Sequence, residues 1–306
     1  MLKAWPRLAV RTRIMAKQPP TKRRKTSTTT DNKGTDKVIT SKYFSTPTAS
    51  KPSSSSSSSS SAYTSSFEPL TWKCFPSLEE VEVHTLILGT HPSITSLKEN
   101  RYFGHKMNAF WWIAGDCLGF RRADGISPST QKPYTLAQYL RHGEEKVIPY
   151  EEQVKVFAAN GFALWDIVQS CQRKGSLDSA IRNETPNDIP GFCQKNPSLK
   201  RIVIANGSTG SNFFLKHFKE WCFSGDLKPA ENTQSQKVFA SIPKEKLENA
   251  RITFVSCVSV SPAAAGFTYL QKRNFWEEHV YNPGLNEKLK NEKKISQENK
   301  PTEQHE

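Results

Sequence analysis

The chain has 306 residues, a formal net charge of +14 from 43 Lys and Arg against 29 Asp and Glu, and only 36% hydrophobic residues. This composition is too polar for one uniform globule, so it predicts a packed domain joined to disordered sequence. No stretch approaches the roughly 18 apolar residues of a membrane-spanning helix, which excludes that class, and we expect no membrane partner. The positive excess points to a polyanionic partner such as nucleic acid.

Most of the positive charge lies near the N-terminus. Residues 1–68 hold 13 Lys and Arg against 3 Asp and Glu, a net charge of +10, whereas residues 69–285 carry +4 and residues 286–306 carry zero. The first segment is rich in Ser, Thr and Lys and buries too little apolar surface to offset its ordering entropy. We therefore expect a disordered basic tail over 1–68, a folded domain over 69–285, and a polar C-terminal tail over 286–306 that frays or forms a lone exposed helix.

The N-terminal tail contains three candidate targeting or docking motifs. Residues 19–26 read as a nuclear localisation signal or, alternatively, as a basic arm that touches DNA phosphates. Residues 1–14 hold three Arg and no acidic residue and resemble a mitochondrial transit peptide, which a second start at Met15 would omit. Residues 37–44 loosely resemble the motif that docks proteins on the sliding clamp, or hold an incidental aromatic pair. We expect a nuclear protein with a second, mitochondrial address as an option.

Cofactor and metal motifs are missing from the sequence. No two of the six cysteines are two or three residues apart, so their spacing does not indicate a zinc or iron–sulfur site. There is also no HExxH motif and no Gly-rich phosphate loop with its Lys. We expect no metal and no cofactor, and this excludes the kinase, dehydrogenase and metallohydrolase classes.

Four short apolar runs without alternation predict strands that are buried on both faces, at residues 84–90, 162–168, 201–205 and 252–258. Helical patterns lie between and after them, at residues 110–118, 151–160, 213–221 and 267–280. Strands that alternate with helices predict an α/β fold with a parallel sheet covered on both faces. Because ligands of such sheets bind beyond the carboxyl ends of the strands, the loops that follow the strands hold the candidate site.

These loops carry motifs of a known family. In chain order they are Gly89-Thr90-His91-Pro92-Ser93, Tyr102-Phe103-Gly104-His105, Asn108-Ala109-Phe110-Trp111, the segment 163–168, Asn206-Gly207 and Ser261-Pro262-Ala263. Over residues 70–283 the ordered set resembles the uracil-DNA glycosylase superfamily, closest to its hypoxanthine-DNA glycosylase (family 6) branch and the mismatch-specific and thymine-DNA glycosylases. The resemblance implies a three-layer α/β/α sandwich with a central four-stranded parallel sheet.

The same resemblance implies a monofunctional DNA glycosylase that initiates base-excision repair. Such an enzyme flips uracil or hypoxanthine out of damaged, mismatched or single-stranded DNA and hydrolyses its N-glycosidic bond without a metal. The protein must hold a water near the sugar and stabilise the charge that develops on the leaving base. We expect the chain to act as a monomer.

Two residues are the catalytic candidates. The resemblance assigns the positioning of the water to Asn108, although an Asn just before a helix is also a favoured N-cap, and both roles can hold together. His91 stands where many relatives have an Asp or Asn, which is the main departure from the family pattern. An amide cannot take a proton as a carboxylate can, so we expect slow chemistry.

The resemblance also implies the base-binding residues. Phe103 is expected to stack on the flipped base, with Tyr102 as its less favoured neighbour. Asn206 either reads the Watson–Crick edge, as donor and acceptor at once, or is a turn residue. His91 and His105 either donate to a base carbonyl or a phosphate or are structural groups.

The final candidate loop resembles the one that pinches a DNA phosphate and enters the base stack; its candidate residues are Ser259, Ser261, Pro262, Ala263 and Ala264. The alanines offer only a small wedge, which favours mismatched or single-stranded substrates. Asp166 and Asp178 match the family pattern, and we expect them to order loops.

Two other classes of function stay open. One is a lesion-binding protein that kept the fold but lost the chemistry, motivated by His91 and the small wedge. The other is an enzyme that acts on free nucleosides, against which the basic tail argues.

Overall fold

The computed structural model describes residues 71–80, 82–123, 130–131 and 135–298. The tail motifs at residues 1–14, 19–26 and 37–44 lie outside the described residues. The described residues belong to one compact unit, Ser65–Glu306.

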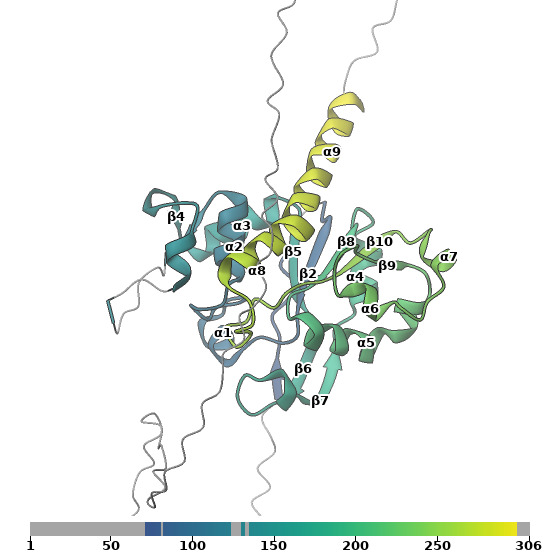
Figure 1. The fold of residues 1–306 in the computed structure, drawn as a ribbon, viewed down its shortest axis with the longest axis horizontal. Helices are drawn as coiled ribbons and strands as arrows, with labels where there is room; N and C mark the ends of the chain where they lie inside the picture. Colours follow the sequence, from purple (N-terminus) through teal and green to yellow (C-terminus); the bar gives the residue numbers. More distant parts are fainter. Residues whose placement is uncertain (1–70, 81, 124–129, 132–134, 299–306) are drawn as a thin grey trace, which may run out of the picture. The chain divides into compact units, whose positions relative to one another are not determined.

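A five-stranded parallel sheet forms the centre of this unit (Figure 1). In spatial order its strands are β5 (Phe162–Asp166), β2 (Thr85–Gly89), β8 (Arg201–Ile204), β10 (Ile252–Ser256) and β9 (Leu227–Pro229). The four predicted strands are the first four in this order. The fifth, β9, has three residues and ends in a proline at the sheet edge, so it leaves no apolar run by which the sequence could reveal it.

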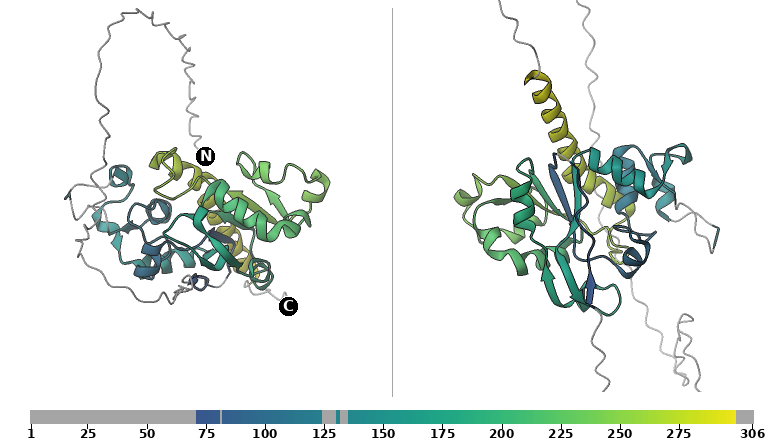
Figure 2. Two further views of the ribbon diagram at one scale, coloured as in Figure 1. Left: turned by 90° about the horizontal axis from the view of Figure 1, so that it is seen from below. Right: turned by 180° about the vertical axis from the view of Figure 1, so that it is seen from behind.

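Alternating side chains along the strands build a core on each face of the sheet. Ile87 and Val203 point into one core, and Leu86, Leu88 and Ile202 point into the other. The first core is covered by α2 (Phe110–Leu118), α3 (Tyr150–Ala159) and α8 (Tyr269–Trp276), the second by α4 (Ile189–Lys195), α5 (Gly207–Phe223) and α6 (Ser235–Val238). Figures 1 and 2 show these helices on opposite sides of the sheet, which confirms the three-layer α/β/α prediction.

A second, antiparallel sheet carries one of the site loops. The chain leaves β5 at Asp166 and enters β6 (Val168–Gln172), which pairs with β1 (Thr71–Lys73) and β7 (Arg182–Pro186). The predicted strand 162–168 is therefore split between two sheets. The remaining elements are α1 (Ile94–Glu99), β3 (Arg121–Arg122), β4 (Val147–Ile148), α7 (Lys244–Leu247), and the short 3₁₀ helices Thr135–Tyr139, Glu144–Lys146 and Asp178–Ala180.

One predicted helix ends at the residue that the sequence indicates, and another is divided in the structure. The predicted helix 110–118 ends at Gly119, whose φ of 85° is the left-handed conformation that glycine adopts freely. By contrast, the predicted helix 267–280 is divided, because a π-helical turn, Glu277–Tyr281, joins α8 to α9 (Asn282–Glu298). The helix thus continues well into the segment 286–306.

A buried carboxylate fastens α2 to α8. Asp116 Oδ1 accepts a hydrogen bond from the Arg141 N–H (2.8 Å), and its Oδ2 accepts from the Tyr269 hydroxyl (2.9 Å) and from Arg273 Nη1 (2.8 Å). The Asp116 and Arg273 side chains are only 2% and 13% exposed. Every oxygen of the buried carboxylate is thus paired with a donor.

We expect Asp116→Ala to lower the free energy of unfolding by about 3–5 kcal/mol, because it leaves the Arg273 guanidinium largely buried without its counter-charge. Denaturant unfolding measures this change. As a control, Glu152→Ala removes an exposed ion pair with Lys155 and should change stability by less than about 0.5 kcal/mol. Equal losses in the two variants would contradict the anchoring role of Asp116.

Candidate active site

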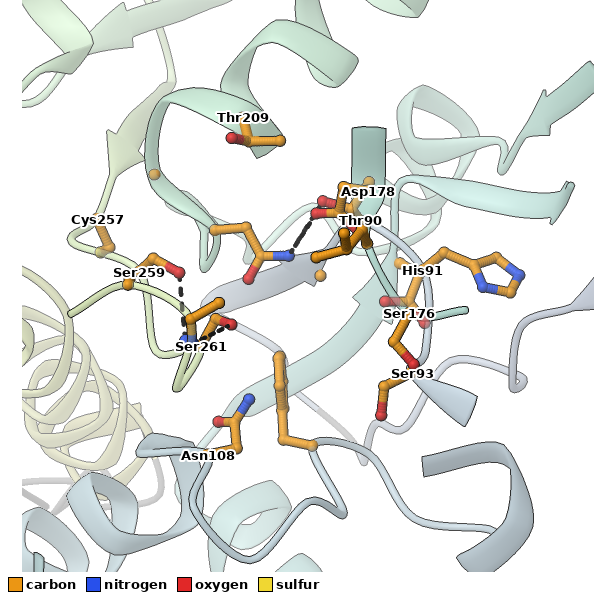
Figure 3. A pocket seen from close by; sticks show the side chains of 18 of the residues that line it. Thr90, His91, Ser93, Asn108, Ser176, Asp178, Thr209, Cys257, Ser259 and Ser261 are labelled. Carbon is orange, nitrogen blue, oxygen red and sulfur yellow. Dashed lines mark hydrogen bonds between the residues drawn. The ribbon is translucent and has the colours of Figure 1, made fainter. Parts of the chain in front are cut away.

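A cavity of about 520 Å³ lies where the central strands end. The loops after β2, β8 and β10 line it, together with Asp166 at the end of β5 and the segment 176–179 that follows β6 (Figure 3). The cavity thus lies at the carboxyl edge of the parallel sheet, where ligands of such sheets bind. Of the predicted site residues, the structure brings the following to this cavity: His91, Tyr102, Phe103, Asn108, Asn206, Ser259, Ser261, Ala263 and Ala264.

Asn206 is held by a closed set of hydrogen bonds. Its Nδ2 group donates to Thr90 Oγ1 (3.1 Å) and to Asp178 Oδ2 (3.3 Å), and the Thr90 hydroxyl also donates to Asp178. Both amide hydrogens therefore have acceptors within the protein. Among the described residues, none donates to Asn206 Oδ1, so Asn206 offers a ligand an acceptor only, rather than the donor and acceptor that we expected.

Phe103 forms an aromatic surface in the cavity. Its ring stacks on Phe110 with a centroid distance of 4.3 Å and an interplanar angle of 24°. Its backbone has a φ of 51°, a strained conformation for a residue with a large side chain, at a cost of about 1–3 kcal/mol. Because Phe110 covers one face of the ring, the other face can stack on a planar ligand.

Asn108 lies just before α2, but the N-cap residue of that helix is Ala109, so the structure does not give Asn108 the predicted N-cap position. Its Oδ1 accepts a hydrogen bond from the N–H of Phe110 (2.9 Å), the first residue of α2. The same side chain lines the cavity, and Figure 3 shows the amide pointing into it. This hydrogen bond, made just ahead of the helix, fixes an amide that still has one oxygen lone pair and an NH₂ group available.

Two acidic residues lie deep in the cavity. Burial raises the pKa of Asp166 to about 8, with a further rise from Asp178 and a partial decrease from Arg173. Burial also raises the pKa of Asp178, against the hydrogen bond from Thr90 and the charge of Arg173. The Arg173 guanidinium lies 3.9 Å from Asp178 and donates to the carbonyl of Pro92.

His91 does not face the other candidate residues. Its imidazole points away from Asn108 and Asp178 (Figure 3), and its Nδ1 donates to the Pro92 carbonyl (3.2 Å). Burial and, second, the charge of Arg173 lower its pKa to about 4, so the ring is neutral at pH 7. This geometry favours a structural role over the catalytic role that we expected.

Tyr102 and His105 are also engaged in the fold. The Tyr102 hydroxyl donates to the carbonyls of Phe75 (3.3 Å) and Pro76 (3.1 Å), so it is occupied within the protein. His105 Nδ1 accepts from the Met107 N–H, and His105 does not line the cavity. Phe103, rather than Tyr102, therefore offers the stacking surface.

The loop after β10 is ordered by short-range hydrogen bonds. Ser259 Oγ accepts from the Ser261 N–H and Ser261 Oγ accepts from the Ala263 N–H, each at 3.2 Å. Lys272 Nζ donates to the Ser261 carbonyl at 3.0 Å. Pro262 stands between the two serine turns and is exposed, outside the cavity lining.

Two exposed apolar side chains at the rim were not among the predicted site residues. Leu177 is 65% exposed and Phe267 is 43% exposed, and both line the cavity. Each is a single large apolar residue in a loop, and from the sequence such a residue does not reveal whether it points inward or outward. Apolar side chains larger than those of Ala263 and Ala264 therefore also line the cavity.

Within the described part of the chain, no group of three or more His, Cys, Asp or Glu side chains is arranged to hold a metal ion. No described helix has both the length and the apolar character needed to cross a bilayer.

Comparisons with known proteins give a consistent set of relatives. No family model matches the chain. Two archaeal proteins named hypoxanthine DNA glycosylase, from Methanosarcina acetivorans and Methanosarcina barkeri, are 28% and 24% identical over 139 residues, which is 45% of this chain and 73% of each relative. A solution NMR structure from M. acetivorans, assigned as a uracil DNA glycosylase, matches with a TM-score of 0.46 and 20% identity over 70% of this chain and 99% of that one.

The buried neutral imidazole predicts a pH dependence of stability. Because the folded pKa of His91 lies below its ordinary value of 6.5, the free energy of unfolding is highest above pH 6.5 and falls as the pH is lowered toward 4. At pH 5 the loss from this group is about 2 kcal/mol. Urea unfolding of the wild type and His91→Gln at pH 7 and pH 5 measures it; parallel losses in both proteins would refute the assignment.

Proposed function

Because the chain belongs to the uracil-DNA glycosylase superfamily, close to its hypoxanthine-DNA glycosylase branch, we propose that it is a DNA N-glycosylase that removes a deaminated base, hypoxanthine or uracil, from DNA. The observation that best supports this proposal is the cavity at the strand ends, which is lined by the aromatic ring of Phe103 and by the amides of Asn108 and Asn206. A base inside it must have been flipped out of the DNA stack.

Asn206 distinguishes a deaminated base from its parent base. Its donors are occupied by Thr90 and Asp178, so only its carbonyl oxygen is left to pair with a ligand. Deamination converts a ring nitrogen from an acceptor, as in adenine N1 or cytosine N3, into an N–H donor, as in hypoxanthine or uracil. Asn206 can therefore accept from the deaminated base and leaves its parent base, adenine or cytosine, unpaired, a difference that a buried site discriminates strongly.

Asn108 orients the attacking water. The electron pair of the glycosidic bond passes to the base, the sugar becomes cation-like, and water adds to its C1′ atom. The free lone pair of Asn108 can accept one hydrogen bond from that water, while the hydrogen bond from the Phe110 N–H keeps the amide in place. The amide orients the water without taking its proton, which suits a reaction whose leaving base carries most of the charge.

Leu177 and Phe267 fit the space that a flipped nucleotide leaves. Both are apolar, exposed and next to the cavity mouth, and such side chains can wedge between base steps. They support a double-stranded substrate, which the small Ala263 and Ala264 side chains alone do not.

Asn108→Ala should reduce single-turnover cleavage of deoxyinosine and deoxyuridine oligonucleotides by about 10²–10⁴-fold, measured as alkali-labile sites. The variant also loses the hydrogen bond from the Phe110 N–H, worth about 1 kcal/mol, so Asn108→Ser is its matched control. Serine keeps an oxygen that can accept from this N–H but lacks the amide, and it should be equally inactive with near-normal stability.

Uncut deoxyuridine, deoxyinosine and deoxyxanthosine substrates at high wild-type concentration would overturn the enzymatic proposal. Salt-dependent binding to damaged duplex without turnover would then support the alternative, a lesion-binding protein on the same fold.

Leu177→Ala should lower cleavage of a duplex substrate by about tenfold or more, because unstacking a base step costs a few kcal/mol that the wedge offsets. Cleavage of the same lesion in single-stranded DNA should change little. Leu270→Ala removes another exposed leucine that does not line the cavity, and it should leave both rates unchanged. Equal losses on single and double strands would count against a wedge.

A further inference from the structure

The proposed chemistry leaves one buried acid of the cavity unused. Asp166 ends β5, pairs in register with Gly89 of β2, lines the cavity and is 3% exposed. A Cβ atom at position 89 would lie 2.3 Å from Asp166 Oδ1, so the carboxyl group occupies the space that any other side chain on Gly89 would need. The glycine thus makes room for the acid above the end of the central strand.

The same point relates Asp166 to the stacking surface. The hypothetical Cβ atom of Gly89 would lie 3.7 Å from Phe103 Cζ. Together the two distances put the carboxyl oxygen within about 6 Å of the edge of the Phe103 ring. A base stacked on Phe103 would therefore turn one edge toward Asp166.

Asp166 and Asn206 flank the end of β2. Asp166 belongs to β5 and Asn206 follows β8, the two strands that pair with β2 on either side. With neighbouring strands about 4.8 Å apart, their backbones are separated by about 10 Å. Two hydrogen bonds and the edge of one base fill a span of this size.

The surroundings of Asp166 disfavour its ionised form. The charged and titratable groups around it are the Asp178 carboxyl, the Arg173 guanidinium, the Tyr102 phenol and the Cys74 thiol. Its Oδ2 is buried and makes no hydrogen bond to any described residue. An ionised carboxylate here would lie beside a second carboxylate without a donor, and burial raises its pKa to about 8.

We propose that Asp166 is a neutral carboxylic acid that donates a hydrogen bond to the carbonyl oxygen of the flipped base, O6 of hypoxanthine or O4 of uracil. This inference rests on the proposed function. Asn206 accepts from the ring N–H and Asp166 donates to the adjoining carbonyl, so the pair is complementary to the edge that deamination creates. Adenine and cytosine carry an amino group at that position and would oppose a donor with a donor.

The hydrogen bond also helps the reaction. When the glycosidic electron pair passes into the base, negative charge gathers on the carbonyl oxygen, and a donor already in place stabilises that anion. Asp166 keeps its proton throughout. The water that adds to C1′ releases the proton that balances the base anion.

The test is single-turnover cleavage of a deoxyinosine duplex between pH 6 and pH 10 by the wild type, Asp166→Asn and Asp166→Ala. The wild-type rate should fall about tenfold per pH unit above pH 8, where the acid ionises. Asp166→Asn keeps an N–H donor that does not titrate, so its rate should stay within about tenfold of wild type at pH 7 and be flat through pH 8. Asp166→Ala should lose about 10²–10³-fold.

A thermal unfolding series reports on the protonation of Asp166 without substrate. The folded state holds a proton that the unfolded chain releases above pH 3.8, so wild-type stability should fall relative to Asp166→Asn as the pH rises from about 4 to about 8. Stability that rises relative to Asp166→Asn over this range would overturn the inference.

The failures of the two proposals can be told apart. A wild type that leaves deoxyinosine and deoxyuridine uncut overturns the proposed function and this inference with it. A wild type that cleaves, with Asp166→Asn as inactive as Asp166→Ala or with a rate that rises through pH 8, overturns only the role of Asp166 as a donor.

Discussion

The candidate site depends on the complete burial of strand β2. All five of its residues are buried, its two edges are hydrogen-bonded to β5 and β8, and its side chains alternate between the two cores. Strand β2 has no solvent-exposed side, and Gly89 at its carboxyl end contributes no side chain. The neighbouring strands therefore supply the polar groups, and the central strand supplies the space between them.

Four of the polar side chains in the cavity are uncharged near pH 7, whereas Asp178 is paired with Arg173, Thr90 and Asn206. His91 is neutral because it is buried, Asp166 favours its protonated form, and Asn108 and Asn206 are amides. A nucleobase is neutral when it enters and gains charge only as it leaves. A site of oriented dipoles therefore interacts most strongly with the late, charged stage of such a reaction. Most of the positive charge of the chain lies instead in residues 1–68, which precede every residue of the candidate site in the sequence.

The sequence predicted those features that depend on local pattern. Four buried strands followed from apolar runs such as 201–205, and the end of α2 followed from Gly119. Edge strand β9 was missed because three residues carry no periodic signal. The structure puts nine of the candidate site residues at the predicted sheet edge, but His105 and Pro262 lie outside the cavity lining, and the side-chain orientations were not predictable. Whether the Asn206 donors are free depends on Asp178, which is 28 residues away and reaches it only through the second sheet.

The backbone at Phe103 limits what this position can become. With a φ of 51°, a β-branched residue such as Val, Ile or Thr would clash with its own backbone, whereas Asn or Gly would fit but bring no ring. An aromatic side chain here must therefore offset the conformational cost by its packing on Phe110. Few residue types are therefore compatible with position 103. A substitution that relieves the backbone strain, such as Gly or Asn, also removes the ring on which a planar ligand could stack.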